Sequence, residues 1–154
     1  MIRWYKDENC AIFFSEEPDI DFRYPSPLNS DKLNKKIIEK PFLLKNKVTI
    51  ALFDFKKRKR YVFTPKLNYD WDGASIPQWA WAIIGGKTDP RFAIPSLVHD
   101  LMCENHQLVC YDRYFADKIF ERLLYVSKVP AIKRWAMFHA VDNYQKTQGW
   151  GHNE

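Results

Sequence analysis

The stretch Lys47-Val-Thr-Ile-Ala-Leu-Phe-Asp-Phe55, followed by Arg60-Tyr-Val-Phe-Thr64, decides the fold. Both runs are apolar and rich in β-branched and aromatic residues, which favour β-strands. The residues from 56 to 60 are all lysine or arginine. We therefore predict a β-hairpin with a basic tip, and this tip is either a contact for phosphate groups or an ordinary solvated turn.

The chain before this hairpin is interrupted by Pro18, Pro25, Pro27 and Pro41. Because proline breaks regular elements, we predict an irregular N-terminal extension over residues 1–45. A short helix at 30–40, with Ser30 as its N-cap, is the expected exception. The hairpin and the strand end then occupy residues 46–72.

Beyond residue 72 the pattern becomes helical, and residues 73–150 are expected to hold a site turn and helices. We predict a short aromatic segment at 78–84 and three helices, at 95–105, at 112–125 and from 130 to about 144. Pro95 suits a first helical turn and Asp112 an N-cap. The expected fold is α+β: a β-hairpin region followed by three helices, in a single domain spanning residues 1–154.

Composition sets loose bounds on function. The chain has 154 residues, a formal net charge of +5 and a pI of about 9.0, which weakly favours anionic partners and is no strong nucleic-acid signal. Three cysteines indicate no disulfide framework. The charged N-terminal residues do not form a signal peptide, and no apolar run approaches a membrane span, so we expect a soluble protein.

Three carboxylates and one imidazole stand in the aromatic, apolar middle of the chain: Asp72, His99, Asp100 and Asp117. Burying such groups without partners costs several kcal/mol each, so we expect them to meet one another or a metal. If the two central helices are antiparallel and joined near Leu108, His99 and Asp117 lie at the same height. Such a contact fixes the tautomer of His99 and leaves the other ring nitrogen available as a base.

Asp100 points about 100° away from His99 on a helix and can face a different partner. Asp72 leads into a glycine-containing turn, where backbone carbonyls can point inward. Two carboxylates with carbonyl oxygens suit a hard cation, which predicts a calcium site.

Other interpretations of these residues stay open. His99 and Asp117 are alternatively a buried structural pair, and Asp72 and Ser75 are alternatively caps of the turn and of a short helix. Arg113 lies four residues before Asp117 and can pair with it. His99, Cys103 and His106 share a helical face that suits zinc.

The aromatic segment also has two interpretations. Its apolar residues are either part of the core or a patch that enters a phospholipid membrane surface beside the site. They are Trp79, Trp81, Ile83 and Ile84.

The motif order Asp-Gly-x-Ser-x-Pro, then His99-Asp100, then Ala116-Asp117-x-x-Phe120 resembles a family of phage and prophage proteins of unassigned function. That resemblance covers about residues 48–150. The same order is similar to the small prokaryotic phospholipases A2 over about residues 72–124. Cys103 stands where those enzymes usually carry a tyrosine, and the second helix has no cysteine for their helix-to-helix disulfide.

The second resemblance implies a phospholipase A2-like antiparallel helix pair with defined roles. His99 would be the general base and Asp117 would orient it, while Asp100 and Asp72 would bind calcium with a carbonyl of Gly73 or Ala74. Ser75, Cys103 and Arg113 would support this site. The implied reaction is calcium-dependent hydrolysis of phospholipid esters.

The phage resemblance implies synthesis in the cytoplasm of a bacterial host, with association with the virion as a further expectation. The alternative is a non-catalytic protein, such as a virion component or an inhibitor of a host system, in which the polar cluster is structural. A third interpretation is a metal-dependent hydrolase of peptide or phosphate bonds.

Overall fold

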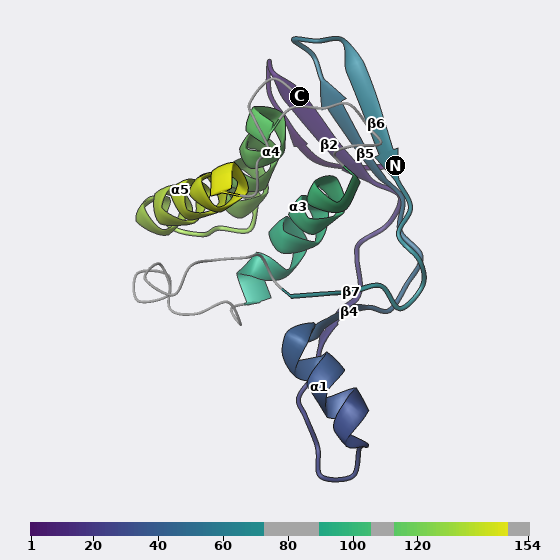
Figure 1. The fold of residues 1–154 in the computed structure, drawn as a ribbon. Helices are drawn as coiled ribbons and strands as arrows, with labels where there is room; N and C mark the ends of the chain where they lie inside the picture. The colour runs from purple at the N-terminus through teal and green to yellow at the C-terminus, as the bar shows by residue number, and fades with distance from the viewer. Residues whose placement is uncertain (73–89, 106–112, 148–154) are drawn as a thin grey trace.

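The computed structural model describes residues 1–72, 90–105 and 113–147, and it has the α+β fold that the sequence predicts. Antiparallel strands and one short helix lie in the described N-terminal part, and helices fill the described C-terminal part (Figure 1). Within these ranges no helix has the length and apolar character needed to cross a membrane.

The first 45 residues are not the irregular extension that the prolines suggested. They contain β1 (Ile2–Lys6), β2 (Cys10–Phe14), β3 (Ile20–Phe22), α1 (Asp31–Glu39) and β4 (Phe42–Leu44). The prolines lie between these short elements, so they mark element ends rather than a lack of structure. The helix expected at 30–40 is present, and the hydroxyl of Ser30 accepts a hydrogen bond from the Leu33 N–H as its N-cap.

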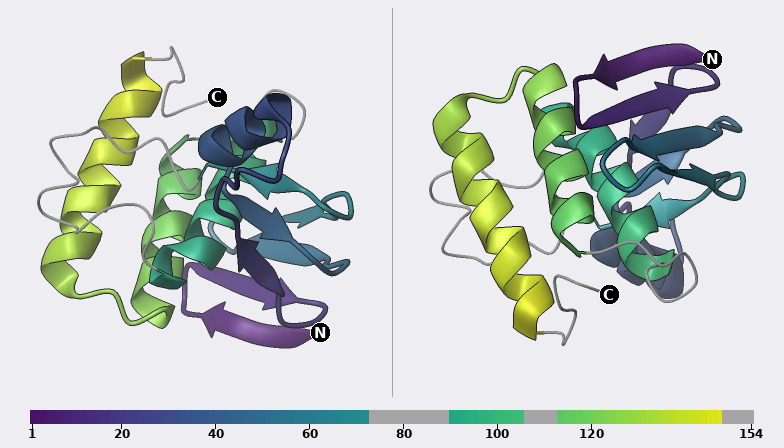
Figure 2. Two further views of the ribbon diagram at one scale, coloured as in Figure 1. Left: turned by 90° about the horizontal axis from the view of Figure 1, so that it is seen from below. Right: turned by 90° about the horizontal axis from the view of Figure 1, so that it is seen from above.

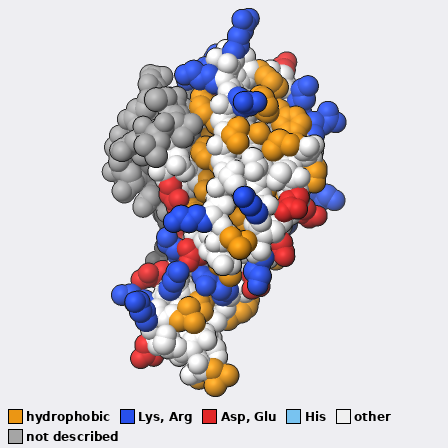
Figure 3. All heavy atoms as spheres, turned by 90° about the vertical axis from the view of Figure 1, so that its right-hand side faces the viewer, with side chains coloured by type: hydrophobic (Ala, Val, Ile, Leu, Met, Phe, Trp, Pro, Cys, Tyr) orange, Lys and Arg blue, Asp and Glu red, His pale blue; other side chains and the backbone are white. Residues whose placement is uncertain are grey.

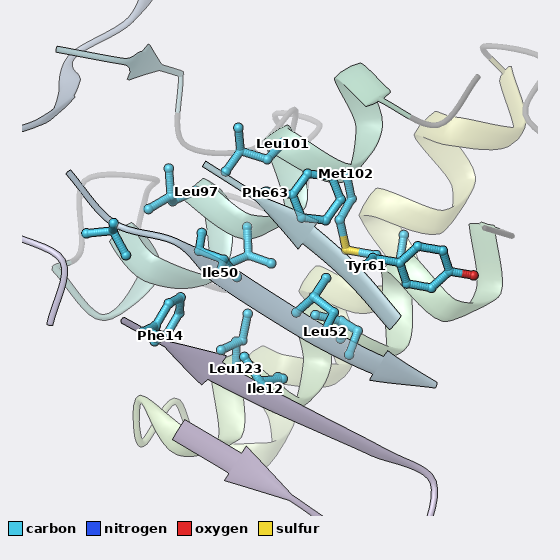
Figure 4. Packing of buried hydrophobic residues seen from close by; sticks show 14 of the residues in the cluster. Ile12, Phe14, Ile50, Leu52, Tyr61, Phe63, Leu97, Leu101, Met102 and Leu123 are labelled. Atoms are coloured by element: carbon cyan, nitrogen blue, oxygen red, sulfur yellow. The ribbon is translucent and has the colours of Figure 1, made fainter. Parts of the chain in front are cut away.

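The main sheet has the strand order β1-β2-β5-β6, and all its pairs are antiparallel. The predicted hairpin is confirmed as β5 (Ile50–Asp54) and β6 (Lys59–Phe63), in which Ile50 pairs with Phe63. Because side chains alternate along a strand, one face of this sheet is mostly apolar. That face packs against helices, as the labelled side chains of Figure 4 show: Ile12, Phe14, Ile50, Leu52, Tyr61 and Phe63 from strands, and Leu97, Leu101, Met102 and Leu123 from helices.

A smaller sheet has the order β3-β4-β7, where β7 is Asp70–Trp71. Its centre is Phe42, whose ring stacks on Trp71 with centroids 5.5 Å apart. The ring of Tyr69 also stacks on Trp71, with centroids 5.7 Å apart. This aromatic stack fixes the chain immediately before the Asp72 turn.

In the part of the chain that the structure describes, three long helices follow the 3-10 turn η1 (Pro90–Phe92): α3 (Ala93–Asn105), α4 (Arg113–Val126) and α5 (Ala131–Thr147). These match the helices that the sequence predicts, with α5 extending three residues further. In Figure 2, α3 and α4 lie next to the main sheet and α5 lies on their far side. A second core cluster joins η1, α4 and α5 through Phe92, Phe120, Leu124, Val129, Ala136, Met137, Ala140 and Val141.

Candidate functional site

The predicted site is built on α3, whose neighbouring residues His99 and Asp100 face different elements. Successive helical residues are rotated by about 100°, so two adjacent side chains cannot share one neighbour. His99 faces α4, whereas Asp100 interacts with Asp72 after β7. One turn of α3 thus connects two polar clusters.

The first cluster joins His99 and Asp117 across the α3–α4 contact. His99 Nε2 lies 3.6 Å from Asp117 Oδ1, and the side chains are only 5% and 1% exposed. This distance is longer than a hydrogen bond but within ion-pair range when the imidazole is protonated. The ring of Phe120 lies 4.8 Å from the imidazole, centroid to centroid, and fixes its plane.

Cys103 completes the surroundings of this imidazole. It lies four residues after His99 on α3, so the two side chains share a helical face. The Cys103 Sγ lies 3.6 Å from Nδ1 and 3.7 Å from Nε2 of His99. The thiol therefore lies beside the imidazole at nearly the same distance from both ring nitrogens.

A tether between β7 and α3 positions the second cluster. The indole N–H of Trp71 donates a hydrogen bond of 2.9 Å to the Ser96 hydroxyl, and that hydroxyl donates to the Ala93 carbonyl at 3.0 Å. Both side chains are buried. Asp72 follows Trp71 directly and Asp100 lies one helical turn after Ser96, so the tether brings the two carboxyl groups together.

The second cluster is the carboxyl pair of Asp72 and Asp100. Burial raises the pKa of the Asp100 carboxyl well above its ordinary value, and the charge of Asp72 and a hydrogen bond with its side chain raise it further. The charge of Glu104 acts in the same direction, while the Asp72 backbone N–H has a smaller opposing effect. Two carboxyl groups held this close are a fitting donor pair for a hard cation, whose charge would remove the repulsion.

The carboxyl pair is not a complete metal site by itself. Among the described residues, no group of three or more His, Cys, Asp or Glu side chains is arranged to hold a metal. The predicted carbonyl ligands at Gly73 and Ala74 lie outside the described residues, as do Ser75 and the membrane-patch residues Trp79, Trp81 and Ile83. His106, the third residue of the zinc alternative, also lies outside them.

Two residues at the edge of the acidic cluster were not predicted. The Tyr69 hydroxyl donates a hydrogen bond of 2.8 Å to Glu104 Oε1. Burial, and then this carboxylate, raise the pKa of Tyr69 far above its ordinary value, so the phenol stays protonated. Glu104 lies four residues after Asp100, and that spacing alone predicts that the two share a face of α3.

Arg113, a predicted supporting residue, forms an ion pair with α5. Its Nε lies 3.2 Å from Asp142 Oδ1 on α5, and the two side chains are 4% and 14% exposed. No motif in the sequence marks Asp142 as this partner. The ion pair connects the beginning of α4 to the later part of α5, and so supports the helix that carries Asp117.

The part of the chain that matches a known protein family is also the part that carries the predicted motifs. The family described as Protein of unknown function (DUF1353) matches residues 49–141. The chain belongs to this family. The DUF1353 match confirms a family of unassigned function, and its boundaries include every described site residue, from Asp72 to Asp117.

One curated relative of this DUF1353 chain is Uncharacterized protein y4jT from Sinorhizobium fredii (strain NBRC 101917 / NGR234). It is 37% identical over 73 residues, which are 47% of this chain and 21% of the relative. The match therefore spans about a fifth of that longer protein. No solved structure matches the chain.

Proposed function

We propose that this DUF1353 chain is a calcium-dependent esterase with a phospholipase A2-like site that hydrolyses phospholipid esters. One observation supports this function above the others: His99 and Asp100 are adjacent on α3, and they face Asp117 and Asp72 respectively. A general base oriented by a carboxylate, next to a pair of carboxyl groups for a cation, is the donor set that ester hydrolysis by water requires.

In this proposal His99 moves the proton. Its Nε2 faces Asp117, so Nδ1 is the nitrogen that takes a proton from the attacking water. The water oxygen bonds to the ester carbonyl carbon, and the proton on Nδ1 passes to the departing alcohol oxygen. Asp117 keeps the ring oriented and stabilises the imidazolium that exists between these two transfers.

Asp72 and Asp100 would hold the calcium ion in this proposal. When bound, the ion supplies positive charge that stabilises the negative carbonyl oxygen during attack. The fit rests on the carboxyl pair itself, because burial and mutual repulsion disfavour two negative charges there without a cation.

The biological setting of the proposed esterase follows only from the resemblance to phage and prophage proteins. We place the esterase in a phage or prophage context, acting on a bacterial membrane during entry or lysis. Trp79, Trp81 and Ile83 remain the proposed contact with the phospholipid surface.

A second candidate function is non-catalytic, and a specific observation favours it. His99 and Asp117 are almost fully buried in the described structure, as expected of a pair that holds α3 and α4 together. In that case the protein would be a virion component or an inhibitor of a host system.

The first experiment is a thermal melt with calcium, with EDTA and with zinc. The proposed site predicts a rise in Tm that is selective for calcium, because ligands that bind the folded state stabilise it. The variant Asp100→Asn should lose this rise, while Asp21→Asn, an exposed carboxylate on β3, should keep it. A melt that is indifferent to millimolar calcium would contradict the cation site.

The second experiment measures hydrolysis of phospholipid vesicles by His99→Gln. If His99 is the base, turnover should disappear while Tm stays within a few degrees of wild type. If the pair is structural, the same variant should lose about 1–3 kcal/mol of stability. His139→Gln is the matched control, since His139 is exposed on α5. Wild-type protein that is stabilised by calcium but hydrolyses no phospholipid would exclude the esterase and leave the cation site.

A further inference from the structure

The outer face of the main sheet carries aromatic and basic side chains that the proposed esterase does not use. Strand alternation places Phe13 of β2, Phe53 of β5 and Val62 of β6 on the side opposite the core. Phe13 and Phe53 are half-buried, and Val62 is 53% exposed. In the space-filling view of this side, hydrophobic side chains gather over the sheet with lysines and arginines around them (Figure 3).

Three phenylalanine rings form a continuous row on this face. The rings of Phe13 and Phe53 lie edge to face with centroids 5.6 Å apart, and Phe53 and Phe55 are 6.3 Å apart at an interplanar angle of 27°. Ala51 and Ala11 are the partners of Phe13 and Phe53 in the β2–β5 register. Because alanine is too short to cover a neighbouring ring, these pairs leave aromatic surface accessible.

Cations lie beside each ring. Arg3 is the partner of Phe13 in the β1–β2 register, and Arg60 is the partner of Phe53 in the β5–β6 register. The Nζ of Lys6 lies 6.0 Å from the centre of the Phe55 ring, within the range of a cation–π contact. No acidic residue occupies these outward-facing strand positions, so Phe13 and Phe53 each have a basic side chain and no carboxylate as a strand neighbour.

The β5–β6 turn adds further positive charge beside this face. Arg58 has a backbone φ of 53°, in the left-handed region where glycine is favoured. The residues 56–59 of this turn are all exposed lysine or arginine.

We propose that this face, the aromatic face (Phe13, Phe53 and Phe55 with Arg3, Lys6, Arg58 and Arg60), binds single-stranded nucleic acid. Bases stack on the phenylalanine rings, and the cations contact the phosphates that run beside them. A sheet that displays aromatic rings between basic side chains suits unpaired bases, because every base has a flat face to stack. The aromatic face lies opposite the sheet surface that packs on α3 and α4, so this inference is independent of the esterase.

Single strands fit this surface better than a membrane does. Phe13 and Phe53 lie on neighbouring strands with their rings at 80° to each other, and the projecting hairpin tip is wholly basic from 56 to 60. Entry into a bilayer interface requires apolar side chains at the part that projects. The spacing of the three rings along neighbouring strands instead suits consecutive stacked bases.

The test is fluorescence anisotropy with a fluorescein-labelled 15-nucleotide oligothymidylate, with the full chain at low salt. We expect saturable binding that weakens as salt increases. Phe53→Leu keeps an apolar side chain but removes the stacking surface, and should weaken binding by at least about fivefold. Arg60→Ala should weaken binding and reduce the dependence on salt.

Two control variants distinguish a specific role of the aromatic face from the general loss of a positive charge or of an aromatic side chain elsewhere. Trp135→Ala removes an exposed aromatic residue from α5, and Lys35→Ala removes an exposed cation from α1. Both should bind like wild type, and circular dichroism should show all variants folded. If binding is absent, or if Phe53→Leu and Phe13→Leu bind as tightly as wild type, the proposal is overturned.

A vesicle arm tests the main competing occupant. Vesicles of phosphatidylglycerol and phosphatidylcholine are sedimented with each variant. Binding to these vesicles that depends on Phe53, without binding to the oligonucleotide, would overturn the nucleic-acid assignment in favour of a lipid surface. Binding to the oligonucleotide that competes with inorganic phosphate alone would show a charge effect and would also overturn it.

Discussion

At the scale of single residues, Arg58 shows a conflict between local backbone preference and side-chain chemistry. Its φ of 53° is disfavoured for any residue with a Cβ. Arg58→Gly should therefore raise the free energy of unfolding by up to about 1 kcal/mol, reduced by the greater entropy of glycine in the unfolded chain. Urea denaturation measures this change. Lys56→Gly, in the same turn without a positive φ, is the control and should give no gain.

The carboxyl pair predicts a pH dependence at the same scale. Because burial and Asp72 raise the pKa of Asp100, the folded state holds a proton that the unfolded state releases at about pH 4. The contribution of Asp100 to the free energy of unfolding is thus largest below that pH and is lost as the pH rises through its folded-state pKa.

Asp100→Asn should remove this loss of stability. In EDTA, wild type should become less stable relative to Asp100→Asn as the pH is raised from about 4 towards neutrality. Tm measured from acidic to neutral pH checks this. Parallel profiles for the two proteins would show that Asp100 carries no shifted proton.

At the scale of elements, Asp7 ties the β1–β2 hairpin to α4. Its Oδ1 accepts the backbone N–H groups of Asn9 and Cys10 at 2.7 and 2.9 Å. Its Oδ2 accepts the Tyr5 hydroxyl at 2.7 Å and Arg122 Nε at 3.1 Å. Burial raises the pKa of Asp7, but these hydrogen bonds to the charged form outweigh it and hold the pKa well below the ordinary value.

Asp7→Asn should accordingly destabilise the protein by about 1–3 kcal/mol at neutral pH. Because the pKa of Asp7 is lowered in the folded state, its charged form stabilises the protein at pH values above its ordinary pKa. This stabilisation is lost as the pH falls through the folded-state pKa, so the difference in stability between Asp7→Asn and wild type should shrink below about pH 4. Urea denaturation at neutral pH and at a pH below about 4 measures this difference in stability. Glu8→Gln, an exposed neighbour, should have little effect at either pH, and an unchanged Asp7→Asn cost in acid would contradict the account.

Elements also show where local sequence was sufficient. The α1 cap, the β5–β6 hairpin and the helices α3, α4 and α5 follow from periodicity, caps and turn residues within the segment itself. Strands β1 and β2 are not predicted by the proline pattern, which indicates an irregular segment, although Cys10–Phe14 is an apolar run. Strand β2 gains its other partner from β5, about 40 residues later in the chain, and such pairing leaves no local periodic signal.

At the scale of the whole molecule, α4 connects the two core clusters. Its Ala116, Ile119 and Leu123 belong to the main core, while Phe120 and Leu124 belong to the cluster with α5. One face of α4 is therefore buried in the main core, and another face is buried in the second cluster. We expect the cores to unfold together, as the single-domain prediction requires.

Leu52→Ala in the main core and Met137→Ala in the second cluster test this cooperativity. Each should cost about 2–5 kcal/mol and shift one common transition. Circular dichroism and tryptophan fluorescence should report the same midpoint in each variant. Ile132→Ala, at an exposed position, should cost less than about 0.5 kcal/mol. Separate transitions would show that α5 and its cluster unfold independently.

The sequence by itself determined the fold class, the central hairpin and the helices, because these depend on contacts between residues close in the chain. It also predicted that His99 and Asp117 face each other, since their equal distances from Leu108 need only an antiparallel helix pair. Their chemical role remains a prediction.

Only the tertiary structure decided which distant groups meet. The hydrogen bond from Trp71 to Ser96, the ion pair of Arg113 with Asp142 and the link from Asp7 to Arg122 join segments separated by 25, 29 and 115 positions. Each depends on how sheet and helices pack and not on any local preference. The packed core brings these polar groups within reach, because burial there is favourable only when each of them finds a partner.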